Sequence, residues 1–64
     1  MIIRTTKVET VTGNTIYERT CTIDGNTITG CQNPFPYIQR KLKKLHMHTV
    51  DMKKDGQNVT LIVR

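Results

Sequence analysis

The sequence predicts a single α+β domain, residues 1–64, in the order β-β-β-α-β-β, with a mainly antiparallel sheet of hairpins and one amphipathic basic helix across one face. Three observations support this prediction. A Gly-Asn or Gly-Gln pair between strand-like segments occurs three times, and glycine supplies the positive φ that tight hairpin turns need. Between Cys31 and Thr49 the apolar residues change to a helical spacing. Threonine, which favours strands, occurs 11 times.

The first hairpin is expected to turn at Gly13-Asn14, between strands near 2–12 and 15–24. A two-residue turn there sets Glu9 opposite Glu18, a mild like-charge penalty on the solvent side. The same pairing places Val8, Tyr17, Cys21 and Ile23 on the core face and leaves Ile3, Val11 and Ile16 facing outward. Either this hairpin carries a different turn, or a partner covers the outward face.

The other two hairpins are expected to turn at Gly25-Asn26 and Gly56-Gln57. The Gly25-Asn26 turn pairs Ile23 with Ile28 and Cys21 with Gly30. The Gly56-Gln57 turn sets Lys54 opposite Val59, Met52 opposite Leu61 and Val50 opposite Val63. This register gives the last hairpin one apolar, core-facing side, formed by Val50, Met52, Val59, Leu61 and Val63.

A helix is expected over residues 34–46. Phe35, Ile38, Leu42 and Leu45 form one apolar stripe at helical spacing. Asn33 is a suitable N-cap, with Pro34 just inside the helix. The remaining strands are expected near 27–31, 48–54 and 57–63. Alternating strand directions allow an antiparallel sheet in the order 3-2-1-5-4, and a split into two smaller sheets is equally open.

The positive charge is concentrated in the second half of the chain. Residues 1–32 have no net charge, so the formal charge of +5 comes from residues 33–64. Such asymmetry points to a polyanionic partner. On the helix Tyr37, Arg40, Lys41 and Lys44 share one face, with Lys43 on the other flank and Lys53 and Lys54 extending the basic surface.

Each of these basic residues also has a purely structural interpretation. Positive charge near a helix C-terminus suits the helix macrodipole. Lysines such as Lys53 and Lys54 on an edge strand discourage pairing with other sheets. Tyr37 can also simply pack against the sheet.

Cys21, Cys31, His46 and His48 are the only residues that suit a tetrahedral metal site. Their spacing lacks the short cysteine pairs of zinc ribbons and fingers. We therefore expect no metal and no cofactor, and two reduced thiols in preference to a disulfide or a zinc site. No apolar segment is long enough for export or for a membrane span, so the expected location is the cytoplasm, without membrane contact.

The residue inventory argues against an enzyme. The chain has no serine, no glycine-rich phosphate loop and too few residues to wall a deep active site. Glu9 and Glu18 could form a carboxylate pair of the kind that glycosidases use, but a solvent-facing strand pair explains them as well.

The sequence therefore predicts a small, non-enzymatic nucleic-acid-binding domain of low sequence specificity. The alternative is a protein-interaction module, such as a phage or mobile-element accessory protein that docks on a host protein or forms a homo-oligomer. The outward apolar residues and the free strand edges motivate this alternative.

Overall fold

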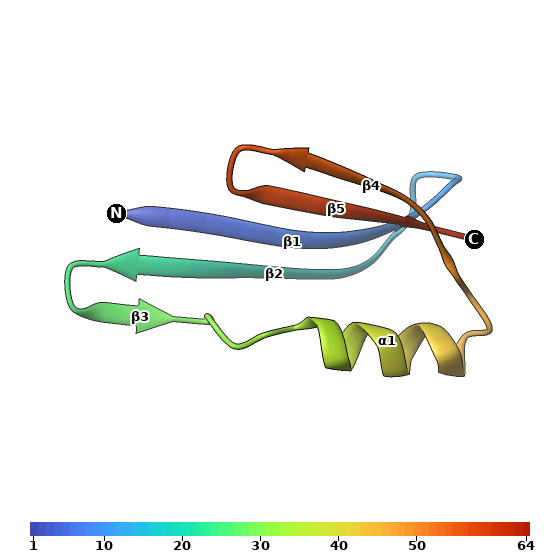
Figure 1. The fold of residues 1–64 in the computed structure, drawn as a ribbon, viewed down its shortest axis with the longest axis horizontal. Helices are drawn as coiled ribbons and strands as arrows, with labels where there is room; N and C mark the ends of the chain where they lie inside the picture. Colours follow the sequence, from blue (N-terminus) through green and yellow to red (C-terminus); the bar gives the residue numbers. More distant parts are fainter.

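Five strands form one sheet in the order β3-β2-β1-β5-β4, with a single helix between β3 and β4 (Figure 1). The computed structural model describes all residues, 1–64. The elements are β1 (Ile2–Thr10), β2 (Thr15–Asp24), β3 (Thr27–Thr29), α1 (Phe35–Lys44), β4 (Thr49–Asp55) and β5 (Asn58–Val63). The α+β class and the element order are confirmed, and of the two arrangements that the sequence left open the structure has the single sheet in the order 3-2-1-5-4.

The sheet is mixed, because its central pair, β1 and β5, is parallel. The other three strand pairs are antiparallel, as expected. The expected mainly antiparallel sheet is confirmed, and its one parallel pair has a geometric reason. Strands that alternate in direction along the chain give the first and the fifth the same direction, and these two are neighbours (Figure 1).

The second and third hairpins turn where the sequence predicts. Gly25 and Gly56 each have φ +58° and occupy the first central position of their turns, as glycine does in a type II′ turn. The predicted pairs Ile23–Ile28, Lys54–Val59 and Met52–Leu61 are all present.

The pairing of Val50 with Val63 is wrong. The register of β4 against β5 shifts between Thr49 and Asp51, so Thr49 lies opposite Val63. Because β4 is an edge strand, Val50 and Met52 are also 54% and 60% exposed, and they do not belong to the core.

The first hairpin has a longer turn than Gly13-Asn14 alone. The Thr10 amide donates to the Asn14 carbonyl at 2.8 Å, and the Gly13 amide donates to the Thr10 carbonyl at 2.9 Å. Glu9 pairs with Thr15 and Val8 with Tyr17, so Ile16 is an extra residue that bulges out of the ladder.

This different turn changes which side chains meet. Ile16 packs against the core and is not outward-facing, whereas Ile3 and Val11 are each 48% exposed. Glu18 lies opposite Lys7, so the expected Glu9–Glu18 pair is also wrong. The different turn, the first of the two explanations that the sequence left open, resolves the apolar mismatch for Ile16 but not for Ile3 and Val11.

Helix α1 begins one residue later and ends two residues earlier than expected. Because the helix begins at Phe35, the N-cap is Pro34 and not the expected Asn33. The Asn33 side-chain oxygen still accepts a hydrogen bond from the Phe35 amide at 3.1 Å. Beyond Lys44 the chain leaves the helix, and His46 takes a left-handed conformation with φ 56°. With ten residues α1 is not long enough to cross a membrane.

The core is small and lies at one end of the sheet. Five side chains are buried: Val8, Ile38, Leu42, Leu61 and Val63. Two of them come from α1, so the helix packs on the sheet through the middle of its predicted apolar stripe. Phe35 and Leu45, at the ends of that stripe, stay 43% and 47% exposed. Figure 1 shows α1 continuing along the line of the short strand β3, so the far end of β1, β2 and β3 has no helix over it.

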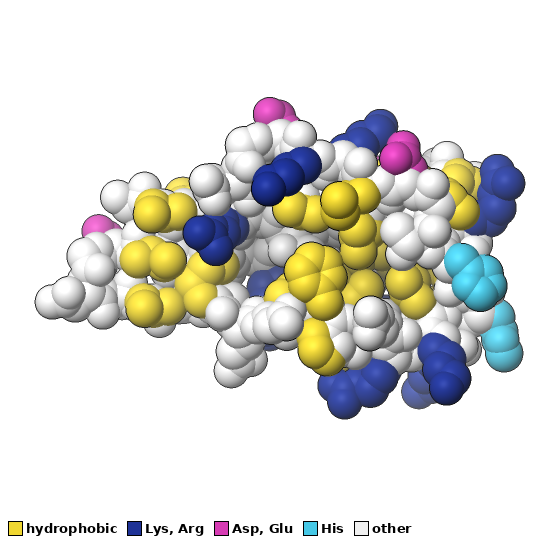
Figure 2. Space-filling model, in the orientation of Figure 1, with side chains coloured by type: hydrophobic (Ala, Val, Ile, Leu, Met, Phe, Trp, Pro, Cys, Tyr) yellow, Lys and Arg dark blue, Asp and Glu magenta, His cyan; other side chains and the backbone are white.

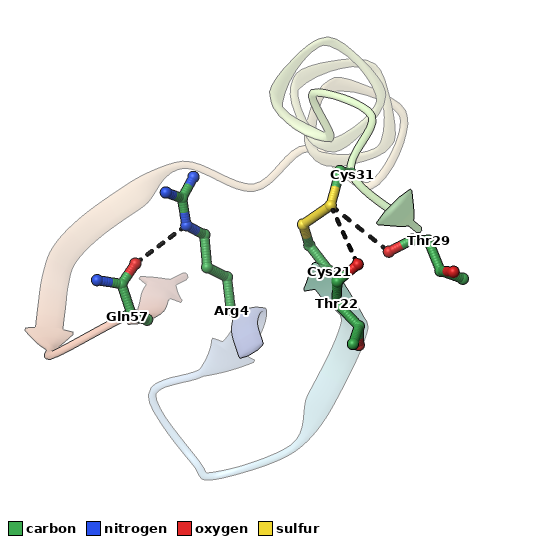
Figure 3. The surroundings of a disulfide bond; sticks show 6 residues. All are labelled: Arg4, Cys21, Thr22, Thr29, Cys31 and Gln57. Atoms are coloured by element: carbon green, nitrogen blue, oxygen red, sulfur yellow. Dashed lines mark hydrogen bonds between the residues drawn. A yellow bond between two sulfur atoms is a disulfide. The ribbon is translucent and has the colours of Figure 1, made fainter. Parts of the chain in front are cut away.

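Cys21 and Cys31 form a disulfide, so the expectation of reduced thiols is wrong (Figure 3). The expected pairing of Cys21 with Gly30 would leave Cys31 opposite Thr20, but β3 ends at Thr29 and Gly30 turns the chain with φ +71°. This turn brings the Cα atoms of the two cysteines within 4.7 Å. The Cys31 sulfur lies 3.5 Å from the Thr29 carbonyl oxygen. Since a disulfide sulfur carries no proton, this is a sulfur–oxygen contact and not a hydrogen bond.

Gly30 should be the least replaceable glycine of the chain. A Cβ at this position would lie 2.5 Å from the backbone oxygen of Thr20, whereas a Cβ at Gly25 would meet nothing within 4 Å. Both residues have positive φ, so Gly25→Ala controls for backbone strain. We expect Gly30→Ala to lower the free energy of unfolding by about 2 kcal/mol more than Gly25→Ala, measured by urea denaturation. Equal losses would contradict this role of close packing.

Reduction of the disulfide should destabilise the fold. The bond closes a loop with a sequence separation of 10 residues, and a loop of this length is expected to contribute about 2–3 kcal/mol. We expect the midpoint of thermal unfolding to fall by about 10 °C or more in reductant. The double variant Cys21→Ala/Cys31→Ala should behave like the reduced protein. An unchanged midpoint, with free thiols shown by titration, would contradict the prediction.

Candidate nucleic-acid interface

Packing of α1 on the sheet determines which of its side chains face solvent. Ile38 and Leu42 are 2% and 8% exposed and point into the core. Residues three or four positions apart share a helix face, so Tyr37, Arg40, Lys41 and Lys44 lie together on another face. The helix contains no acidic residue.

Tyr37 is the centre of this face. Its ring is 5.5 Å from the ring of Tyr17 on β2, between centroids, at an interplanar angle of 40°. The Lys41 Nζ lies 6.0 Å from the Tyr37 centroid, at the outer limit of a cation–π contact. Tyr37 is still 49% exposed, so the contacts orient the ring and leave part of it free.

Four of the seven predicted binding residues line one open depression on this side. Its lining consists of Tyr37, Arg40, Lys41, Lys44 and Leu45. A neighbouring depression shares Tyr37 and Arg40 and reaches the sheet at Tyr17 and Arg19. We define the helix-face cluster as Tyr37, Arg40, Lys41, Lys44 and Arg19.

Arg19 was missed by the sequence reasoning. It lies two residues after Tyr17 on β2, so it points to the same face of the sheet, and that alternation was the signal that could have identified it. Its guanidinium Nη1 donates to the Gln32 side-chain oxygen at 3.5 Å.

The three other predicted residues lie elsewhere. Lys43 lines a separate depression at the C-terminal end of α1, with His46 and His48. Lys53 and Lys54 are on β4, at the sheet edge opposite β3. Lys54 lies opposite Val59, on the α1 side, whereas Lys53 lies opposite Thr60, on the other face. The structure therefore does not join the β4 lysines to the helix-face cluster.

The strand register separates the charges of the two faces. All five carboxylates alternate onto the face away from α1: Glu9, Glu18, Asp24, Asp51 and Asp55. Three basic residues accompany them there: Lys7, Lys53 and Arg64, which follows the core residue Val63 in the ladder. The α1 side carries Arg4, Arg19, Lys54 and the basic residues of the helix, with no carboxylate from any strand. In Figure 2, acidic side chains are visible only at the rim of the molecule.

We name the face away from α1 the acidic face. One of its lysines, Lys7, is paired with one of its carboxylates. Lys7 Nζ lies 2.9 Å from a carboxylate oxygen of Glu9. The hydrogen bond and the attraction to Glu9 raise the pKa of Lys7 above its ordinary value. Lys7 therefore has a carboxylate partner within its own face, unlike the basic residues of the helix-face cluster.

No group of three or more His, Cys, Asp or Glu side chains lies close enough to hold a metal ion. The two cysteines of the considered zinc set are joined to each other.

Comparisons with protein-family models, with curated proteins and with solved structures find no match to this chain.

Proposed function

We propose that this chain is a small nucleic-acid-binding domain that contacts phosphates through the α1 side of its sheet. The separation of charge between the two faces is the observation that supports this proposal. A face with several cations and no carboxylate attracts a polyanion and releases its counterions. If the basic residues served only solubility, carboxylates would be expected on both faces.

The helix-face cluster suits a flexible or single-stranded ligand. Its cations surround an aromatic ring that is about half exposed, and a base can stack on such a ring. Phosphate contacts position a ligand and carry no sequence information. No asparagine or glutamine lines the depression of Tyr37, Arg40, Lys41, Lys44 and Leu45, and the side-chain oxygen of Gln32 already accepts from Arg19. We therefore propose low sequence specificity.

Two findings define the contact residues and the conditions of the test. Lys53 projects from the acidic face, so it is not a contact in this arrangement. A cytoplasmic location stays a prediction, and disulfides such as Cys21–Cys31 are usually reduced there. Binding is therefore to be measured in both redox states.

Removing two charges from the helix-face cluster should weaken binding more than removing two from the acidic face. We expect Arg40→Gln/Lys44→Gln to reduce the slope of log affinity against log salt by about 1–2. The control Lys7→Gln/Lys53→Gln lowers the net charge equally. The measurement is fluorescence anisotropy with labelled single- and double-stranded DNA and RNA at low and physiological salt.

Equal effects of the two double variants would mean that only the net charge matters. Absence of binding at physiological salt would reject the proposal and favour the protein-interaction alternative, including the phage or mobile-element accessory protein.

Tyr37 should matter for single strands in particular. Loss of a stacked base costs about 1–3 kcal/mol, so we expect Tyr37→Ala to weaken single-strand binding by about tenfold or more. Tyr37→Phe keeps the ring and should bind like the parent chain. If Tyr37→Phe binds as weakly as Tyr37→Ala, the hydroxyl is the contact and not the ring face.

A further inference from the structure

The two edges of the sheet differ in how they are protected against pairing with other strands. Edge strand β4 carries Asp51, Lys53, Lys54 and Asp55. Charges of this kind discourage edge-to-edge pairing. Edge strand β3 consists of Thr27, Ile28 and Thr29 and has no charge. The β3 edge is short, but it is the one of the two that no charge protects.

A row of isoleucines leads to this edge. Ile2, Ile23 and Ile28 lie opposite one another on the neighbouring strands β1, β2 and β3. The row is on the α1 side of the sheet but beyond the end of the helix, so Ile2 and Ile28 are 46% and 65% exposed. Figure 2 shows hydrophobic side chains gathered at this end of the molecule, over the β2–β3 hairpin.

The backbone of Ile28 is oriented for pairing at the edge. The two-residue turn makes Asp24 and Thr27 the hydrogen-bonded pair next to it, so the following pair, Ile23 and Ile28, is not hydrogen-bonded. The N–H and C=O groups of Ile28 therefore point away from β2, towards the free edge.

The exposed area of the chain is large for its mass. A compact monomer of 7.4 kDa is expected to expose about 4,200 Å², whereas this chain exposes 4927 Å². The excess of about 700 Å² approaches the roughly 800 Å² that each partner buries in a standard interface. A second copy paired at the β3 edge would bury part of this area, at Ile28 and its neighbours along the edge.

We propose that a second copy of this chain pairs with the β3 edge, antiparallel, about a two-fold axis at Ile28. Ile28 then exchanges both backbone hydrogen bonds with Ile28 of the partner subunit. Thr27 lies opposite Thr29 of the partner subunit, so each of the three strand positions meets a compatible residue. The two isoleucine rows become one row on one face of a continuous sheet, and the interface is isologous.

The oligomeric state tests this proposal directly. Light scattering after size exclusion and sedimentation, from low micromolar to near-millimolar concentration, should show a dimer. Ile28→Lys puts a charge on the edge and should weaken dimerisation at least about tenfold. The matched control is Met52→Lys, because Met52 is 60% exposed, lies on the same sheet face and belongs to the other edge strand. Circular dichroism verifies that both variants fold.

Amide hydrogen exchange locates the interface without a variant. Exchange at the Ile28 amide should slow as the concentration of the parent chain rises, whereas amides at the free edge of β4 should be unaffected. A monomer at all concentrations would overturn the proposal. A dimer that Ile28→Lys leaves intact would overturn it too, because the contact would then lie on another surface.

Discussion

The contact of Ile38 and Leu42 with Val8, Leu61 and Val63 is the one on which the rest of the structure depends. These five are the only buried side chains, so this contact is the main one that packs the helix onto the sheet, with the Tyr17–Tyr37 ring contact beside it. It also fixes the rotation of α1, and the rotation decides that Tyr37 and its neighbouring cations face solvent. With so few buried side chains, a covalent link matters more than in a larger domain. The Cys21–Cys31 bond supplies one just before the helix begins.

The same register that builds the core also separates the charges. Along each strand successive side chains alternate between faces, so any residue in phase with Val8, Leu61 and Val63 points to the α1 side. Every carboxylate of the chain is out of phase with that set. A shift of one residue in any strand would remove the apolar residues from the core and bring carboxylates to the basic side. Folding and charge separation are therefore determined by one pattern.

Much of the fold could be predicted because its signals are local. Gly25 and Gly56 mark two turns and alternation sets their registers, whereas the choice between one sheet and two stayed open because it depends on the contact of β1 with β5, which are far apart in the chain. The errors arise where the chain breaks its own periodicity. The bulged residues Ile16 and Val50 shift the registers, and the turn at Gly30 brings Cys31 to Cys21, which no spacing rule indicates. The cluster on the helix could be predicted from one helical wheel, whereas Arg19 and the placement of Lys53 required the pairing of separate strands.

The two proposals interact through symmetry and charge. A two-fold axis that relates antiparallel strands of one sheet runs perpendicular to that sheet, so it places the α1 sides of both copies on the same side. One ligand could then span two basic faces, and the second contact would gain from its high effective concentration. Each copy carries a formal charge of +5, so mutual repulsion opposes the dimer in the absence of ligand. A polyanion across both faces would relieve this repulsion, and by linkage dimerisation would strengthen binding by the same factor.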